Sequence, residues 1–216
     1  MISYRYQFTM TRPNELPEAD CLAQILIHLG RAARCEDGAS GLTAAQWTCL
    51  RFLARANART RTPSGFASFH ATTRGTASQI TKSLECRGLI ARRRSEEDGR
   101  SVRFDLTEQG RKVLADDPFQ DLVAAIADLD ETERRAFHAT LMRLAAQLAA
   151  RRGLPAFGTC DDCKHLEERT SGAHCACMGR DIEITDRASL CANHAASELT
   201  PGRTIAKTGH DRNDND

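Results

Sequence analysis

Five cysteines near the carboxyl end of the chain have a spacing that suits a metal. Cys160 and Cys163 form a C-x2-C pair, which allows two thiolates of one tight turn to reach the same ion. A C-x-C pair and a lone cysteine follow, and four thiolates suit zinc or an iron–sulfur cluster about equally. Three histidines lie nearby and leave the ligand set open: His165, His174 and His194. The set that we prefer is Cys160, Cys163, Cys175 and Cys191, and Cys177 is an alternative ligand or a spare thiol.

The preferred spacing, C-x2-C-x11-C-x15-C, resembles that of small cluster-binding domains related to high-potential iron–sulfur proteins. The region has few large apolar residues, so we expect a metal to stabilise its fold. Those residues are Leu166, Ile182, Ile184 and Leu190. Zinc would be structural, whereas a cluster would act as a sensor because oxidation or iron loss removes it. The predicted cofactor is an iron–sulfur cluster, and Zn²⁺ is the alternative.

A second stretch, residues 72–106, combines a polar helix face with a basic hairpin. Ala77, Ile80 and Leu84 recur at the spacing of one buried helix side. The opposite side carries groups suited to base edges and phosphates, namely Gly75, Ser78, Gln79 and Lys82. Thr72 or Thr73 can cap this helix and Gly88 can end it. Two strand-like segments then flank the turn signal Asp98-Gly99, and arginines crowd them: Arg92, Arg93, Arg94, Arg100 and Arg103.

Short motifs follow one another through this part of the chain. They are Phe66-Ala67, Ser78 to Leu84, Leu84-Glu85-x-x-Gly88-Leu89-Ile90-x-Arg92, Asp98-x-Arg100 and Leu106-Thr107-x-x-Gly110. As an ordered set they resemble the MarR family of winged helix-turn-helix repressors, over roughly Pro17 to Ala150. The resemblance implies a mainly α fold with a small β wing, and a homodimer formed by the first and last helices of two subunits. The last third, from Gly153, lies outside the family pattern.

The resemblance also implies that the chain binds double-stranded DNA. Two recognition helices would enter successive major grooves roughly 34 Å apart, so the operator should be an inverted repeat. Gln79 and Arg74 are the candidates for base contacts. We assign Thr73, Thr76, Ser78 and Lys82 to phosphates, and Arg94 and Arg100 to the flanking minor groove. Charge agrees with this, because residues 43–106 hold 12 Lys or Arg against 5 Asp or Glu, a net +7, whereas the whole chain has +1.

Helices should position these residues. We expect one over residues 17–34, with Leu22, Ile25, Leu26 and Leu29 on one face, and one over residues 43–57 with Trp47 in the core. A short helix after Thr62-Pro63 should turn Phe66, Ala67 and Phe69 inward. Helical segments follow from Thr107 and over residues 121–128. Asp130 and Glu133 should open a long helix that ends near Arg152. Its seam is Phe137, Leu141, Leu144 and Leu148, a pattern that favours packing on another helix.

Length and composition favour one core and a small extra module. The chain has 216 residues, 41% of them hydrophobic. We expect an arm over residues 1–16, the winged-helix and dimerisation region over 17–152, the cysteine module over 153–199 and a disordered tail over 200–216. No secretory signal or membrane-length apolar run is evident, so we expect a cytoplasmic protein in which clustered cysteines hold metal and not disulfides.

Three alternatives remain open. Cys21, near the start of the first helix, is a possible redox thiol of a peroxide-sensing repressor, although the only tyrosines are Tyr4 and Tyr6. An aromatic acid could instead act as a small-molecule effector. A thiol oxidoreductase built on Cys160 and Cys163 would need a thioredoxin-like βαβ context, and these flanks resemble loops. No catalytic triad, phosphate loop or HExxH motif is present, so the sequence does not predict an enzyme.

Overall fold

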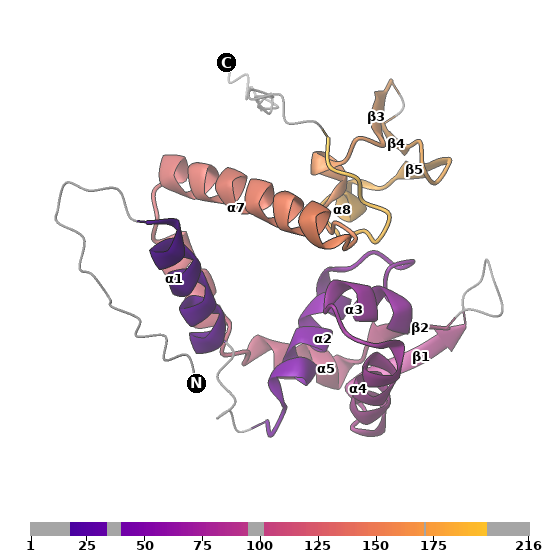
Figure 1. Cartoon of the computed structure of the whole chain (residues 1–216). Helices are drawn as coiled ribbons and strands as arrows, with labels where there is room; N and C mark the ends of the chain where they lie inside the picture. Colours follow the sequence, from indigo (N-terminus) through magenta and orange to yellow (C-terminus); the bar gives the residue numbers. More distant parts are fainter. Residues whose placement is uncertain (1–17, 34–39, 95–101, 171, 198–216) are drawn as a thin grey trace, which may run out of the picture.

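The computed structural model describes residues 18–33, 40–94, 102–170 and 172–197. The predicted arm and tail, the hairpin turn Asp98-Gly99 and Arg100 lie outside the described residues. The elements, in chain order, are α1 (Ala19–Ala32), α2 (Ala44–Arg55), α3 (Pro63–Phe69), α4 (Arg74–Cys86), β1 (Ile90–Arg94), β2 (Val102–Leu106), α5 (Glu108–Ala115), α6 (Gln120–Ala127), α7 (Glu131–Arg152), η1 (Cys160–Asp162), β3 (Leu166–Arg169), β4 (Gly172–Cys175), β5 (Arg180–Ile182) and α8 (Ile184–Arg187). The prediction of a mainly helical fold with a β wing and a long helix is confirmed, and the carboxyl-terminal region adds a small sheet (Figure 1).

Side-chain caps determine where the main helices begin. Thr43 with Gln46 forms a capping box at α2, and Asp130 with Glu133 forms the predicted one at α7. Thr73, and not Thr72, caps α4, where its hydroxyl accepts a hydrogen bond from the Thr76 amide. Gly88 ends the same helix with φ +69°, a conformation that glycine adopts without a steric penalty. The amide of Leu89 then donates to the Leu84 carbonyl, which satisfies an otherwise unpaired helix terminus.

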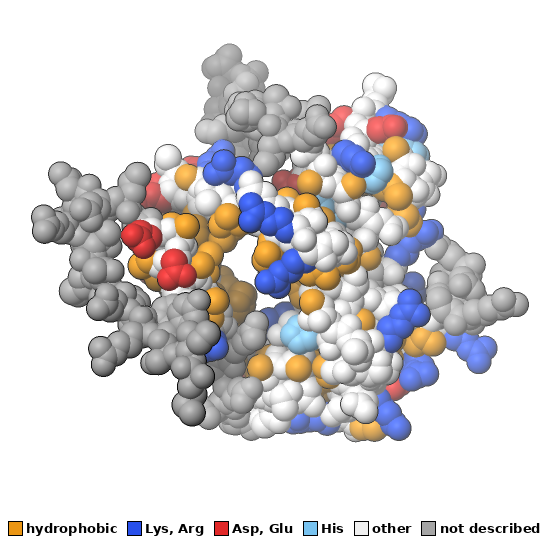
Figure 2. All heavy atoms as spheres, viewed as in Figure 1, with side chains coloured by type: hydrophobic (Ala, Val, Ile, Leu, Met, Phe, Trp, Pro, Cys, Tyr) orange, Lys and Arg blue, Asp and Glu red, His pale blue; other side chains and the backbone are white. Residues whose placement is uncertain are grey.

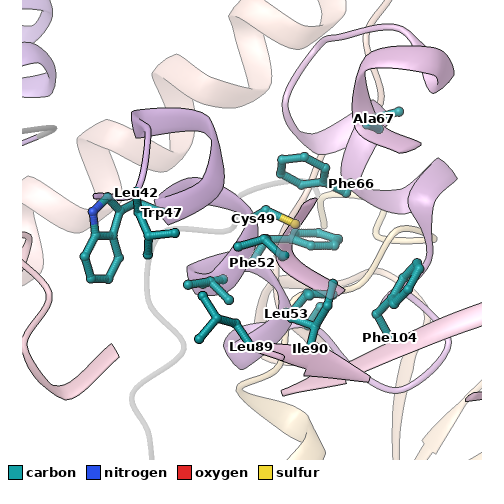
Figure 3. Close-up of a cluster of buried hydrophobic side chains, with 14 residues drawn as sticks. Leu42, Trp47, Cys49, Phe52, Leu53, Phe66, Ala67, Leu89, Ile90 and Phe104 are labelled. Carbon is teal, nitrogen blue, oxygen red and sulfur yellow. The ribbon is translucent and has the colours of Figure 1, made fainter. Parts of the chain in front are cut away.

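The core lies between α2, α3, α4 and the hairpin (Figure 3). Its largest fully buried side chains include Phe52, Phe66 and Phe104, from two helices and from β2. Trp47 is buried as expected, and Phe66 and Ala67 turn inward. Phe69 is 36% exposed because it lies at the rim, where its ring contacts Phe157 from beyond α7.

The wing is an antiparallel pair in which Ile90 faces Leu106 and Arg92 faces Phe104. Strand β2 is bonded to the loop between α2 and α3, because the Phe104 amide donates to the Arg61 carbonyl at 2.8 Å. The side chain of Arg61 adds an ion pair with Asp105 at 3.1 Å. The middle of β2 is therefore fixed to the loop between α2 and α3.

Helices α1, α6 and α7 extend away from this core, and none of their described residues is buried. Figure 1 shows α7 crossing above the other helices and α1 standing apart from α2. Large apolar side chains remain exposed on them: Leu22, Ile25, Leu26, Ile27, Leu29, Val123, Leu144 and Leu148. Within the described part of the chain, no helix is long and apolar enough to cross a membrane.

One buried ion pair joins the core to the segment that leads into α6 and α7. Arg51 of α2 donates two hydrogen bonds to Asp117, at 2.6 and 2.5 Å. The same carboxylate accepts a bond at 2.9 Å from the amide of Phe119, just before α6. The pair therefore fixes the position from which α6 and α7 leave the core.

The cysteine module is a three-stranded antiparallel sheet in the order β3-β4-β5, with η1 and α8 beside it. The four large apolar residues of the module differ in their surroundings. Leu166 and Ile182 line the interior of the module. Ile184 is 88% exposed, because it opens the short helix α8 at the surface. Leu190 packs against the core of the winged-helix region instead.

Candidate functional site

The outer face of α4 is polar and open to solvent. Ala77 and Leu84 are fully buried and Ile80 packs on the core, as the periodicity predicts. All six predicted contact residues on α4 and its cap are exposed, namely Thr73, Arg74, Thr76, Ser78, Gln79 and Lys82. The structure therefore brings them onto one helix with their side chains available to a ligand; which of them contact DNA stays a prediction.

The hairpin arginines differ in their surroundings. Arg92 lies 3.5 Å from Glu85 and over the ring of Phe104, and Arg93 pairs with Asp105 at 2.9 Å. Arg94 is exposed at the end of β1, beside the segment that contains Arg100. Figure 2 shows Lys and Arg side chains along the side of the molecule formed by α4 and the hairpin. The basic edge is thus continuous with the polar face of α4.

Three residues on or beside α4 were not singled out from the sequence, and two of them, Gln46 and Arg87, join this helix to other segments. Thr81 is buried on α4, and its hydroxyl donates within the helix to the carbonyls of Ala77 and Ser78. Gln46 of α2 donates to Ser83 at 3.0 Å. Arg87, at the end of α4, donates to two carbonyls of the segment before α2 at 2.6 and 3.1 Å, so this arginine holds the end of α4 against that segment. A polar residue among apolar helix positions was the only sequence signal available for Thr81.

The structure brings the four preferred cysteines to one small cavity of about 10 Å³. Cys160 and Cys163 flank the single turn of η1, and the amide of Cys163 donates to the Cys160 carbonyl at 3.0 Å. Cys175 ends β4 at the start of a tight turn, where it is followed by the exposed Cys177. Cys191 approaches from the segment after α8. The geometry thus distinguishes Cys175 from Cys177, which does not line the cavity.

The environment of the Cys160 thiol opposes its ionisation in the absence of a cation. Burial, then the charges of Cys191, Cys163 and Cys175, raises the pKa of the Cys160 thiol from 9.0 to about 11. Each neighbouring thiolate contributes because the sulfur atoms share one poorly solvated space. A divalent cation reverses this balance, since metal binding deprotonates a coordinating thiol.

One observation argues against a metal at these cysteines, and one argues for it. Among the described residues, no three His, Cys, Asp or Glu side chains lie close enough, as placed, to hold a single ion. However, Cys160, Cys175 and Cys191 also line a second cavity of about 100 Å³, so there is room for a group larger than one ion. The donor set consists of soft thiols, which suits iron–sulfur chemistry or zinc. The metal itself stays a prediction.

The three histidines have different roles. His165 lines the cysteine cavity and remains an alternative ligand. His174 binds Asp181 on the neighbouring strand at 2.8 Å. His194 is buried, with Nε2 at 3.2 Å from the Asp162 carbonyl and an Nδ1 that has no partner among the described residues.

The remaining thiols do not form a catalytic arrangement within the described residues. Cys49 is fully buried, and burial raises its pKa to about 12. Cys21 is half-buried on α1, while Tyr4 and Tyr6 lie outside the described residues. Cys160 and Cys163 lie beside an antiparallel sheet and not in a βαβ unit, which gives no support to the thioredoxin-like alternative.

Comparison with known proteins identifies the winged-helix region. A sequence profile of the MarR family matches residues 40–101. The structure of transcriptional regulator PA3341 is 26% identical, covers 60% of this chain and 98% of its own, and has a TM-score of 0.51. The MepR–DNA complex of S. aureus (21% identity, 61% and 96% coverage, TM-score 0.49) and Streptococcus pneumoniae FabT with DNA (22%, 61% and 94%, 0.46) also match. The comparison with curated proteins gave no match. Residues 40–101 are therefore similar to the winged helix-turn-helix segment of MarR family transcriptional regulators.

Proposed function

We propose that the protein is a homodimeric repressor that binds an inverted-repeat operator. The observation that carries this proposal is the polar, exposed face of α4 beside the basic hairpin. A second helix of a helix-turn-helix pair enters the major groove, and a two-fold dimer presents two such helices one helical turn apart. MepR and FabT, to which part of the chain is similar, have both been solved in complex with DNA.

Gln79 and Arg74 read bases, because glutamine pairs with adenine and arginine with guanine through two hydrogen bonds. We assign Thr73, Thr76, Ser78 and Lys82 to phosphates, which fix the register but carry no sequence information. Arg94 and Arg100 reach the flanking minor groove from the hairpin.

A second copy of the chain covers the apolar side chains of α1, α6 and α7. Leu148 is 50% exposed and Leu144 46% exposed in the single chain, on the seam that the sequence predicts. Figure 2 shows hydrophobic side chains around an opening between these helices and the winged-helix region. Apolar surface of this extent on one side of a molecule favours a protein interface.

DNA titrations over a salt series test the nucleic-acid proposal. The probe is a duplex that contains the palindromes near the protein's own gene. Lys82→Ala should weaken binding at every sequence and lower the salt slope by about 1, since one phosphate contact is lost. Gln79→Ala should cost about 1–3 kcal/mol and relax the preference at one base pair. Arg135→Ala on α7 removes one positive charge far along the chain from α4 and should leave the slope unchanged. Equal salt slopes for Lys82→Ala and wild type would contradict the contact.

We further propose that the cysteine module holds an iron–sulfur cluster that modulates DNA binding. The cavity shared by Cys160, Cys163, Cys175 and Cys191 supports a thiolate site, and the adjoining larger cavity favours a cluster over a single ion. When bound, the cluster supplies a redox-sensitive link between the turns that carry the cysteines. Zn²⁺ is the alternative group, in which case an aromatic acid or peroxide at Cys21 would supply the signal.

Anaerobically purified full-length protein distinguishes these groups. Visible absorption with stoichiometric iron and sulfide supports the cluster, and each single Cys→Ser change at the four positions should remove it. Cys177→Ser is the matched control and should keep the absorption, because this residue lies outside the cavity. A colourless sample with one zinc per chain would overturn the cluster.

A further inference from the structure

The segment that carries Cys191 is docked on the DNA-binding region. Leu190 forms a parallel bridge with Ala56, just after α2. The Leu190 amide donates to the Arg55 carbonyl at 2.7 Å, and the Asn57 amide donates to the Leu190 carbonyl at 2.9 Å. The residue before Cys191 is therefore held by backbone hydrogen bonds to the end of α2.

The residue after Cys191 is held in the same way. The amide of Ala192 donates to the hydroxyl of Thr60 at 2.9 Å. Thr60 is almost fully buried, so water does not easily replace this bond. Hydrogen bonds to the loop between α2 and α3 thus flank Cys191 on both sides.

Apolar contacts strengthen the docking. Leu190 and Phe157 pack against the core of the winged-helix region. The ring of Phe157 meets that of Phe69 edge-on, with centroids 5.2 Å apart. The module therefore contacts the DNA-binding region directly, in addition to its covalent link through α7.

The four cysteines are positioned by different parts of the molecule. Cys160, Cys163 and Cys175 belong to turns and a strand within the module. Cys191 is joined to the module by its amide, which donates to Gly158 at 3.0 Å, but its neighbours on both sides are bonded to residues 55–60. The geometry points to the DNA-binding region as the element that positions the fourth thiol, that of Cys191, with Thr60 as the positioning residue. Metal binding and docking of the module therefore form one linked equilibrium. This inference rests on the proposed metal site.

The docked loop leads directly to the elements that bind DNA. Residues 55–60 precede the cap of α3, Thr62, and the Thr60 carbonyl packs on Gly65 inside α3. The next residue, Arg61, holds the wing through its carbonyl and its side chain. Loss of the metal would release residues 190–192, and with them the support of the α2–α3 loop. By linkage, operator binding would in turn slow the loss of metal.

Release of the metal to a chelator from the loaded full-length protein tests the coupling. Thr60→Val removes the acceptor hydroxyl but no thiol, and we expect about three- to tenfold faster release, as loss of one buried hydrogen bond implies. Thr60→Ser keeps the hydroxyl and should restore the wild-type rate. Thr48→Val is the matched control, because its hydroxyl donates to the Ala44 carbonyl within α2. Equal release from Thr60→Val and wild type would overturn the coupling.

Hydrogen exchange on the wild type gives a test that needs no variant. The Asn57 and Leu190 amides, which form the docking bonds, should exchange more slowly in the loaded protein than in the metal-free protein. Unchanged exchange at both amides, in a protein that does bind metal, overturns the coupling alone. A wild-type chain that takes up neither iron nor zinc overturns the metal site itself.

Discussion

The buried ion pair between Arg51 and Asp117 should be one of the most sensitive points of the fold, and its two members should differ. The carboxylate is 2% exposed, whereas the guanidinium is 19% exposed. Arg51→Met would leave a buried carboxylate whose one remaining donor among the described residues is the Phe119 amide, at a cost of about 3–5 kcal/mol. Asp117→Asn would leave a guanidinium that still reaches water and the Phe119 ring, at a cost of about 1.5–3 kcal/mol.

Thermal and urea unfolding at fixed protein concentration measure the difference. A loss of 3–5 kcal/mol corresponds to a fall in Tm of about 6–20 °C for a chain of this size. The double variant Arg51→Met/Asp117→Leu removes both charges and should be more stable than Arg51→Met alone. Arg135→Met is the control, since its pair with Glu131 is about 70% exposed and should contribute under about 0.5 kcal/mol. If Arg51→Met is no less stable than the double variant, the reasoning is refuted.

Three other changes have defined outcomes. Gly110→Ala would place a Cβ 2.1 Å from the Leu89 carbonyl oxygen and should destabilise the fold by about 1–3 kcal/mol. Gly75→Ala is the comparison, because its Cβ would meet nothing nearer than 3.8 Å, and it should stabilise the fold by about 0.5–1 kcal/mol. Urea midpoints in the opposite order would contradict this packing. Leu148→Glu should convert the proposed dimer to monomers in light scattering, because the charge would enter the apolar seam of α7. Arg152→Glu at the end of the helix is the comparison and should leave the dimer intact, and a dimeric Leu148→Glu would count against the seam. In metal-free protein at pH 8, the raised pKa values of Cys160 (about 11) and Cys49 (about 12) leave little thiolate at either residue. Peptide mapping should therefore find both alkylated more slowly than Cys177, and the alkylation rate of Cys160 should rise about tenfold per pH unit up to its pKa. Equal alkylation rates at pH 8 would be inconsistent with the burial of Cys160 and Cys49.

Local patterns in the sequence determined much of the fold. The spacing of Ala77, Ile80 and Leu84 predicted the buried side of α4, and the capping pair Asp130 and Glu133 predicted where α7 begins. Such features depend on residues three or four positions apart, which a helix brings together whatever the rest of the chain does. The same holds for the C-x2-C pair, since its two thiols share one turn.

Contacts between distant segments were decided only by the tertiary structure. The sequence left Cys175 and Cys177 as alternatives, and only the strand pairing of the module turned Cys175 into the cavity. Leu190 was assigned to the module, yet it packs on the winged-helix core. The partnership of Thr60 with Ala192 spans 132 positions and has no periodic signal, because hydrogen bonds across such separations depend on how whole elements pack. The sequence alone therefore determined the polar face of α4 and the cluster of cysteines. Only packing decided that the fourth cysteine is held against the winged-helix region.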